Sequence, residues 1–547
     1  SSPIARVQAG SEELAPIDAP NAEVVTIEPR TGAIISMVGS LDYENEEIDG
    51  EINMALAPRQ PGSSVKPYTY LTAFEEGYTA ASLVWDVRTV FDDFPNPPYV
   101  PENYDRTYSG PVLFRDALQR SLNVPAVKVM DMVGVGRVIE TMHRMGINTL
   151  REEDVGLSLT LGGGEITLLD HVYAMSVLAN DGIMVGTPVP ELQRRPGYRE
   201  LDPVSILMIV DAKGDEIYRY SAPETREVVS PQLSYIMQNI MSDNVARTPA
   251  FGENNPLILP GRPVAAKTGT TNDFRDGWTI GYTPQYVTGV WVGNADYRVM
   301  TTETSAAAAN VAAPIWQQSM EFIHRGLPPE EFAPPLGIVE QEVCATSGML
   351  PTPACPDTRR EVFVEGTSPT VPDTLYQEIR VCGESGRLAT AACPSNQVRT
   401  QVFMMIPPEA EDWARENNIP LPPSLYQSAS ETVGIATGPV AIGNPAPYTY
   451  VSGVVPITGN AYSEIVIQPT ATPAPEVTEE PTPVPGEGTP VPGDATPVPG
   501  DATPAPSDGE PTPVPDLEPA VTPTPEVSLR MGRAAALRAP QPQALTA

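Results

Sequence analysis

The chain has 547 residues, 64 of them proline, and a formal net charge of −36. Its length allows about two to four domains, but so much proline indicates that part of it does not form a globular core. The acidic charge argues against nucleic-acid binding, which needs basic patches, and the lack of any run of about eighteen apolar residues argues against a signal peptide or membrane span within the chain.

Residues 1–21 are acidic, contain proline and lack a periodic pattern, so we interpret them as a linker. Two β-rich runs follow, residues 23–27 and 33–38, and the sequence PRTG between them predicts a hairpin. Helical spacing of apolar residues then predicts helices over residues 65–76, 112–122, 125–132, 136–145 and 167–180.

A second hairpin is predicted from residues 206–210 and 216–220, and a helix from residues 230–242, which begin with Ser-Pro. Residues 263–292 return to a β pattern with three strands, and residues 312–325 are amphipathic with helical spacing. Strands at both ends with helices between them predict an α/β fold of the α+β kind, in which the two ends complete a largely antiparallel sheet.

The character of the chain changes after residue 326, where proline clusters begin and a short unit repeats. CATSGMLPTPACP and CGESGRLATAACP each contain two cysteines separated by ten residues and followed by proline. Of three possible pairings we favour the local ones, Cys344 with Cys355 and Cys382 with Cys393, which would suit an oxidising compartment. A four-cysteine zinc site and free thiols are the alternatives.

The predicted organisation has five parts. A linker (1–21) precedes the main domain (22–326), and the cysteine repeats lie in a proline-rich extension (327–430). A small β module is expected over 431–470, because residues 448–457 are rich in aromatic and β-branched side chains. From 471 to the end, repeated Pro, Thr and acidic residues predict a disordered, extended tail.

The first stretch with chemical potential is RQPGSSVKP, in which Ser63 precedes Lys66 by three residues. On a helix that begins here, the two side chains share a face, and the unpaired N–H groups of the helix end would stabilise an oxyanion near Ser63. The chain has only four lysines and three histidines. A retained lysine suggests a group that must lose its proton, so Ser63 with Lys66 is a better nucleophile and base than a Ser-His-Asp triad.

Two further motifs are weak alone. Ser121-Leu122-Asn123 ends a predicted helix, where Ser and Asn are common as caps. Lys267-Thr268-Gly269-Thr270 lies on a predicted strand, where Thr268 and Thr270 would share a face and Gly269 would let another backbone approach closely.

The order S-x-x-K, S-x-N, K-T-G-T resembles the motif set of penicillin-recognising serine transferases. The surrounding segments, such as LGGGEITLLDHVYAMSVLANDG and AAKTGTTNDFRDGWTIGYTPQYVTGVWVGN, resemble the transpeptidase domain of class A penicillin-binding proteins. The resemblance covers about residues 23–326 and implies a five-stranded antiparallel sheet flanked by helices, with a mostly helical subdomain and the active site between them. It also implies a D,D-transpeptidase that cross-links peptidoglycan stem peptides and is inhibited by β-lactams.

The resemblance assigns roles at the matching positions. Ser63 would attack the penultimate D-Ala of a D-Ala–D-Ala stem peptide and form an acyl-enzyme with release of the terminal D-Ala. Lys66, kept neutral by burial and by nearby Lys267, would take the Ser63 proton. Ser121 would relay a proton to the leaving amine, and Asn123 would position Lys66 and the peptide amide.

On the strand, Lys267 would hold Ser121, and the Thr268 and Thr270 hydroxyls would bind the substrate carboxylate beside Gly269. The N–H groups of Ser63 and Thr270 would form the oxyanion hole, worth roughly 3 kcal/mol per donor. Neither a metal nor a cofactor is implied.

Several alternatives stay open. A β-lactamase would need a carboxylate to activate water, and Glu165 is the candidate, although its glycine-rich setting fits a transpeptidase better. Arg275 and Asp276 are interpreted as an ion pair at the rim. A D,D-carboxypeptidase and a non-catalytic module that binds peptidoglycan or penicillin are the other candidate functions.

The sequence departs from the family pattern at the N-terminus, where class A proteins carry a membrane helix and a glycosyltransferase domain. Neither is expected in this chain, so polymerising activity is not expected either. The implied setting is extracytoplasmic, at the cell envelope, with the membrane reached only through an N-terminal anchor outside this sequence. The implied partners are stem peptides and β-lactams, and no nucleic acid.

Overall fold

The computed structural model describes residues 21–92, 97–151, 155–271, 274–300, 307–383 and 385–426, together with the backbone of three short strands farther on. The helices are α1 (Lys66–Glu75), α2 (Phe114–Gln119), α3 (Asn123–Val133), α4 (Val135–Met145), α5 (Leu168–Ala179), α6 (Pro231–Met241), α7 (Asn244–Phe251), α8 (Ala308–Ile323) and α9 (Glu411–Glu416).

The longer strands are β1 (Asn21–Glu28), β2 (Ala33–Val38), β3 (Leu83–Asp86), β4 (Gly110–Leu113), β5 (Ile183–Pro188), β8 (Glu216–Arg219), β9 (Glu224–Glu227), β10 (Ala265–Thr270), β11 (Asp276–Tyr282), β12 (Val287–Gly293) and β13 to β16, given below. The shorter ones are β6 (Leu201–Asp202), β7 (Met208–Val210), β17 (Leu425–Tyr426), β18 (Gly434–Ile435), β19 (Ala441–Asn444) and β20 (Thr458–Asn460).

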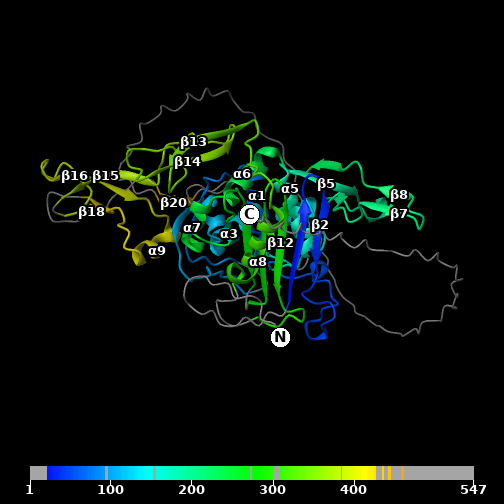
Figure 1. The fold of residues 1–547 in the computed structure, drawn as a ribbon. Coiled ribbons are helices and arrows are strands. Elements are labelled where there is room, and N and C mark those ends of the chain that lie inside the picture. Colours follow the sequence, from blue (N-terminus) through cyan, green and yellow to red (C-terminus); the bar gives the residue numbers. More distant parts are fainter. Residues whose placement is uncertain are drawn as a thin grey trace, which may run out of the picture. The chain divides into compact units, whose positions relative to one another are not determined.

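The central sheet has five antiparallel strands in the order β10-β11-β12-β1-β2 (Figure 1). β1, the first strand along the chain, pairs with β12, the last strand of this sheet along the chain, with Asn21 opposite Gly293 and Ile27 opposite Val287. The predicted hairpin of residues 23–38 and the closure of the sheet by strands from both ends of the domain are therefore confirmed.

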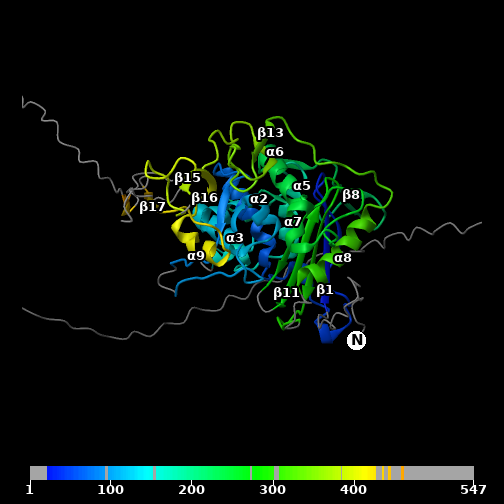
Figure 2. The same ribbon diagram turned by 90° about the vertical axis from the view of Figure 1, so that its left-hand side faces the viewer.

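Helices cover both faces of this sheet (Figure 2). On one face, Trp316 of α8 packs directly on Gly281, where an added Cβ would lie 2.3 Å from the Trp316 ring. The indole N–H of Trp316 donates to the carbonyl of Thr288. On the other face, a Cβ on Gly289 would be 2.3 Å from a methyl group of Val172 in α5. Glycines in β11 and β12 thus let both helices pack closely against the strands.

The helical part of the domain surrounds α1, in which every residue from Lys66 to Phe74 is buried. A helix that is buried on all sides lies in the interior of a domain. The helices α3, α4 and α6 pack against α1. The Tyr70 and Phe114 rings meet edge to face at 5.4 Å in this core. This arrangement places the start of α1 next to the edge of the sheet.

Most predicted helices match α1 and α3 to α6 within a few residues, but the prediction over residues 112–122 is wrong at its start. Residues 110–113 form β4, which pairs with β3, and the helix α2 begins only at Phe114. The pattern Pro-Val-Leu-Phe fits either structure, and pairing with Leu83–Asp86 decides in favour of the strand. The strands β3, β5 and β9 and the helix α7 were not predicted.

The two cysteine repeats fold as two hairpins, β13 (Ile338–Cys344) with β14 (Thr358–Val364), and β15 (Tyr376–Cys382) with β16 (Val398–Met404). Each carries one disulfide, Cys344–Cys355 in the first and Cys382–Cys393 in the second. The predicted local pairing is confirmed, which removes the zinc-site and free-thiol alternatives.

Other predictions fall outside the described residues. These are the linker up to residue 20, the strand over residues 448–457 and the extended tail from residue 471. Of the helices that the structure describes, none combines the length and the apolar character that crossing a membrane requires.

Candidate active site

The turn that carries Ser63 is a short 3-10 helix, Gly62–Val65, which leads directly into α1 at Lys66. Gly62 has φ of 54°, a left-handed conformation that favours glycine. Pro67 lies in the first turn of α1, where its missing N–H costs no hydrogen bond. The prediction that a helix begins here is confirmed, with the first turn tightened to a 3-10 helix.

Three glycines bring this turn against its neighbours. A Cβ on Gly62 would lie 2.6 Å from the carbonyl oxygen of Thr270, and one on Gly269 would lie 2.0 Å from the carbonyl oxygen of Pro61. A Cβ on Gly162 would lie 2.2 Å from the nitrogen of Gly62. The predicted close backbone approach at Gly269 is therefore confirmed, and the turn is pressed between β10 and the Gly162 loop.

Lys66 is fully buried, and its amine donates to three oxygens of the S-x-N segment. The distances from its Nζ are 2.6 Å to the Ser121 carbonyl, 3.0 Å to the Leu122 carbonyl and 2.7 Å to Asn123 Oδ1. Burial holds the pKa of Lys66 well below its ordinary value, and the positive charge of Lys267 lowers it further. The amine is therefore suited to losing a proton.

Ser121 lies between the two lysines. Its carbonyl accepts from Lys66, and its hydroxyl accepts from Lys267 Nζ at 2.8 Å. Its φ is 59°, an unusual value for a residue other than glycine. Strained backbone of this kind is common at functional sites, and here the same residue turns its carbonyl and its side chain to different lysines.

Lys267 lies on β10 and is almost fully buried. Burial, together with the positive charge of Arg247, lowers the pKa of Lys267 to about 7. Arg247 is itself buried on α7 and donates to the carbonyls of Met241 and Ala266. Arg247 was not among the candidates, because α7 was not predicted and nothing in its local sequence marks it as buried.

Asn123 is the first residue of α3, and a polar chain from β3 holds it in place. Its backbone N–H donates to Asn103 Oδ1 at 2.8 Å, and the Asn103 amide donates to Asp86 Oδ1 at 2.8 Å. Asp86 also accepts from the backbone N–H of Ser109 at 2.8 Å. Asn103 and Asp86 are supporting residues that spacing alone did not reveal.

The strand β10 is an edge strand of the sheet, with β11 on one side only. An edge strand has backbone N–H and C=O groups that an extended peptide can pair with. Thr270 is half-buried, and its hydroxyl accepts from the backbone N–H of Ala308 at 2.9 Å, while Thr268 is buried on the same strand. The structure therefore brings all eight candidate residues to the region where β10, the Ser63 turn and the start of α3 meet.

The amine of Lys66 is not hydrogen-bonded to the hydroxyl of Ser63 in this arrangement. Among the hydrogen bonds of the described residues, none joins the hydroxyl of Ser63 to the amine of Lys66, which instead donates to Ser121, Leu122 and Asn123. Catalytic hydrogen bonds are often loose without substrate and tighten in the reacting complex. The sequence left open whether the two groups are in direct contact in the resting state, and in this structure they are not hydrogen-bonded to each other.

The flanking charged residues differ from expectation. Asp276 is buried and accepts from the Trp291 indole at 2.9 Å and the Thr271 hydroxyl at 3.2 Å, while Arg275 donates to the Tyr297 carbonyl. Interpreting Arg275 and Asp276 as an ion pair is therefore wrong, because each of the two side chains binds other partners. Glu165 is exposed, and its one hydrogen bond in the described structure is from the Tyr297 hydroxyl at 3.5 Å.

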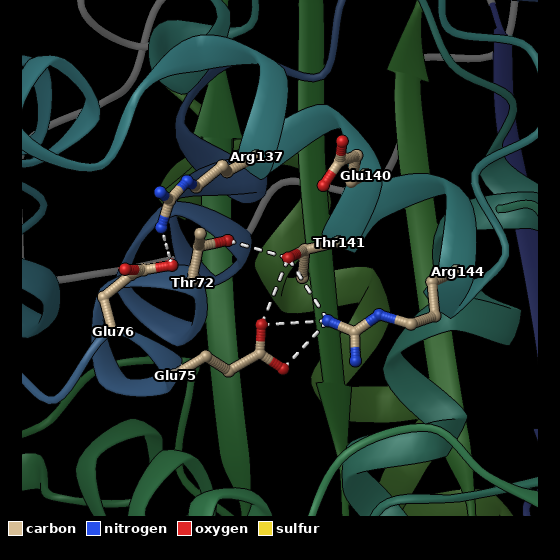
Figure 3. Close-up of a pocket in the computed structure, with 7 residues that line it drawn as sticks. All are labelled: Thr72, Glu75, Glu76, Arg137, Glu140, Thr141 and Arg144. Atoms are coloured by element: carbon tan, nitrogen blue, oxygen red, sulfur yellow. Dashed lines mark hydrogen bonds and ion pairs between the residues drawn. The ribbon is translucent and has the colours of Figure 1, made fainter.

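A separate cavity of about 460 Å³ lies between α1 and α4 (Figure 3). Glu75 faces Arg144 at 2.8 Å and Glu76 pairs with Arg137 across it, so charges of both signs line its walls. None of the eight candidate residues lines this cavity. Within the described part of the chain, no three His, Cys, Asp or Glu side chains are grouped to hold a metal ion.

Comparison with known families gives two matches. Residues 22–321 match the family model of the penicillin binding protein transpeptidase domain, and residues 334–378 match that of the penicillin-binding protein 1A C-terminal domain.

Among curated proteins, penicillin-binding protein 1A of Pseudomonas aeruginosa is 32% identical over 404 residues, which cover 67% of this chain and 48% of that protein. The corresponding protein of Aquifex aeolicus is 32% identical over 349 residues, covering 64% of this chain and 44% of that protein. The chain thus spans about half the length of these relatives.

A crystal structure of penicillin-binding protein 1A from Haemophilus influenzae matches with a TM-score of 0.55 and 24% identity, covering 65% of this chain and 55% of that one. At this identity the match concerns the fold, and it agrees with a sheet flanked by helices.

Proposed function

The chain belongs to the penicillin-binding protein transpeptidase family, and from this membership we propose that residues 22–326 form a serine D,D-transpeptidase that cross-links peptidoglycan stem peptides. The observation that carries the proposal is the position of Ser121 between two buried lysines of lowered pKa, Lys66 and Lys267. Such an arrangement supplies a base and a proton relay without histidine.

In the first step, Ser63 Oγ forms a bond to the carbonyl carbon of the penultimate D-Ala. The neutral amine of Lys66 takes the proton of Ser63, and the carbon–nitrogen bond to the terminal D-Ala breaks. The leaving nitrogen receives a proton through the hydroxyl of Ser121, which accepts a hydrogen bond from Lys267 at 2.8 Å. The products are an acyl-enzyme ester on Ser63 and free D-Ala.

The developing oxyanion would be held by the backbone N–H groups of Ser63 and Thr270. The tight packing of Gly62 against Thr270 supports this role, because it brings the Ser63 turn and the end of β10 together. The carboxylate of the substrate would lie by Lys267 and the hydroxyls of Thr268 and Thr270. A peptide aligned along the free edge of β10 would present its carbonyl to Ser63.

In the second step, an amine of a neighbouring stem peptide attacks the ester, and Ser63 recovers its proton. Water in place of the amine would give D,D-carboxypeptidase activity, and the two reactions share every residue named above. The exposure of Glu165, with its hydrogen bond to Tyr297, supports neither a buried water-activating carboxylate nor a β-lactamase.

We place this reaction outside the cytoplasm, at the cell envelope. Two disulfides support this setting, since disulfides persist in oxidising compartments. The reaction also needs no nucleotide, because the energy of the D-Ala–D-Ala bond is kept in the ester. β-Lactams, whose strained amide resembles the scissile bond, would acylate the same serine.

A fluorescent penicillin tests the proposal. We expect covalent labelling of the protein, a labelled peptide that contains Ser63, and complete loss of labelling in Ser63→Ala. Ser319→Ala serves as the control, because Ser319 lies on α8 and donates to the carbonyl of Ile315, away from the candidate residues. Labelling that survives in Ser63→Ala would refute the assignment of the nucleophile.

A stem-peptide mimic separates the remaining functions. Release of D-Ala with transfer of the acyl group to an added acceptor amine indicates a transpeptidase. Release of D-Ala with hydrolysis alone indicates a carboxypeptidase, and labelling without release of D-Ala indicates a non-catalytic binding module.

A further inference from the structure

Three buried polar side chains lie in a row behind the Ser63 turn, and the reaction proposed above uses none of them. Ser64 follows the nucleophile, Tyr68 lies one turn farther along α1, and His171 lies on α5. His171 Nε2 is 3.0 Å from Ser64 Oγ, and its Nδ1 is 2.8 Å from the hydroxyl of Tyr68. All three side chains are fully buried.

One set of hydrogen-bond donors and acceptors is consistent with the contacts of Ser64, His171 and Tyr68. Ser64 Oγ donates to the carbonyl of Pro61 at 2.7 Å, so it accepts a hydrogen bond from His171 Nε2–H. Nδ1 of His171 is then free to accept from the hydroxyl of Tyr68. Burial lowers the pKa of His171 to about 3, which keeps the ring neutral, as this arrangement requires.

Through Ser64, this row of side chains is hydrogen-bonded to the backbone of the turn that contains Ser63. The Pro61 carbonyl accepts from both the hydroxyl and the backbone N–H of Ser64, at 2.7 and 3.3 Å. These bonds close a turn with Ser63 inside it. The same carbonyl and the same N–H press against Gly269 of β10, where a Cβ would lie 2.0 and 2.8 Å from them. A change in the direction of the Pro61 carbonyl would therefore move the Pro61–Gly62 peptide group and, through the N–H of Ser64, the peptide group that follows Ser63.

We propose that His171 is a positioning residue for acylation: through Ser64 it fixes the turn of residues 61–64, and so the directions of the Ser63 hydroxyl and N–H. The proposal rests on the transpeptidase function proposed above. His171 is not the base, because its Nε2 faces Ser64 and its ring is fully buried. Its place on α5, which packs against β1 and β12, ties the turn to the central sheet.

The test measures the reaction of the purified chain with a fluorescent penicillin at increasing concentrations, which separates the binding constant from the acylation rate constant. His171→Leu removes both hydrogen bonds, and we expect the acylation rate constant to fall about 10- to 100-fold with little change in binding, since small misplacements cost this much. His171→Gln keeps a donor for Ser64 and an acceptor for Tyr68. Its rate constant should lie between those of the wild type and His171→Leu.

His143→Leu is the matched control for lost stability. His143 is a buried histidine on α4 whose Nε2 is 3.0 Å from the Leu150 carbonyl and whose ring stacks on Tyr198, and both of these partners lie outside the Ser63 turn. All variants are measured well below their melting temperatures. We expect His143→Leu to lower the melting temperature but to acylate at the wild-type rate.

A double-mutant cycle with Ser64→Ala tests the path of the effect. If His171 acts through Ser64, the double variant is no slower than the slower single variant, whereas independent effects multiply and overturn the proposal. A wild-type acylation rate in His171→Leu also overturns it and leaves the proposed function intact. A wild-type chain that does not react with penicillin refutes both.

Discussion

The amine of Lys66 owes its chemistry to its surroundings. Burial disfavours its charged form, and Lys267 adds a second positive charge nearby, so that both effects lower its pKa. The acidic side chain of Asp86 opposes them. Three accepting oxygens surround the nitrogen: the protonated amine can donate to all three, and the neutral amine, with two N–H groups, donates to two and keeps its lone pair for the proton of Ser63.

The pH dependence of acylation tests this balance. Lys66 and Lys267 titrate as a coupled pair, and repulsion between the two positive charges lets the first proton leave at a lower pH than it would from an isolated lysine. Acylation needs neutral Lys66, so the second-order rate constant of acylation should rise with pH and level off once Lys66 has lost its proton. Lys267→Gln removes the repulsion, which raises the pKa of Lys66 and should move the midpoint of the profile to higher pH.

The quantity to compare is the pH at the midpoint of the acylation profile. The rate itself is not informative, because Lys267→Gln also loses the contact with Ser121 and slows the reaction at every pH. Lys128→Gln is the control, since Lys128 pairs with Glu409 at 3.5 Å and, among the hydrogen bonds and ion pairs of the described residues, has none with a candidate residue. A midpoint that stays in place or falls in Lys267→Gln would show that Lys267 does not set the pKa of Lys66.

The sequence predicts the residues whose chemistry depends on type and spacing. Ser63, Lys66 and Lys267 are recognisable because lysine is rare in this chain and because the three motifs occur in order. Arg247 and His171 are not recognisable, because their roles come from burial against segments far away in the sequence. An arginine and a histidine on amphipathic helices have the same local pattern whether they are exposed or buried.

At the scale of elements, strands and helices with strong periodicity were predictable, and those that depend on pairing were not. The runs that became β1 and β2 alternate clearly and meet at a turn, so the sequence determines them locally. The run that became β4 fits a helix equally well, and only Leu83–Asp86, far from it in sequence, makes it a strand. Glu224–Glu227, or β9, is exposed and polar, with no pattern of its own.

The strand β14 also determines how the first cysteine hairpin joins the main domain. Arg115 of α2 donates from Nε to Glu361 Oε2 at 2.8 Å, and both side chains are buried. Arg115 also pairs with Asp243 at 3.2 Å and donates to Asn239. A buried charge that loses its partner is strongly destabilising, whereas an exposed pair contributes little.

We therefore expect Glu361→Gln to lower the free energy of unfolding by about 3 kcal/mol, because Arg115 stays buried and loses the partner with the largest effect on it, keeping Asp243 and the more weakly acting Asp116. Urea unfolding followed by tryptophan fluorescence measures the change. Glu340→Gln is the matched control on β13, where Glu340 pairs with Arg360 at 3.4 Å in solvent, and no measurable change is expected. Equal effects of the two substitutions would contradict the role assigned to the buried pair.

At the scale of the whole molecule, the described residues up to 426 belong to one compact unit. Both cysteine hairpins within it contact the main domain, but differently. In the first, Gly348 packs so closely on Ala81 that a Cβ would lie 1.9 Å from its carbonyl oxygen. The second is followed by α9, whose Trp413 meets Trp85 edge to face at 6.1 Å and donates to the Tyr108 carbonyl. The two copies of the repeat are thus similar in sequence but lie next to different parts of the main domain.

This difference predicts different consequences for the two disulfides. Each closes a loop with a sequence separation of 11 residues, so the chain-entropy model assigns each about 3 kcal/mol. Gly348, which packs on Ala81, lies inside the loop closed by Cys344–Cys355. In the loop closed by Cys382–Cys393, Gly386 has no atoms near the position of its Cβ. The close contact that Gly348 makes in the first loop therefore has no counterpart at the matching Gly386 of the second.

Replacing Cys344 and Cys355 by alanine should lower the melting temperature of the main domain together with that of the first hairpin. Replacing Cys382 and Cys393 should destabilise the second hairpin and leave the main transition and the penicillin acylation rate unchanged. Scanning calorimetry follows the transitions, and limited proteolysis followed by mass spectrometry locates the first cleavage in each variant. Because the loops have equal length, the entropic cost is the same in both variants, so a difference in the main transition reports the contact with Ala81. Identical shifts in both variants would show that this contact contributes nothing to the stability of the main domain.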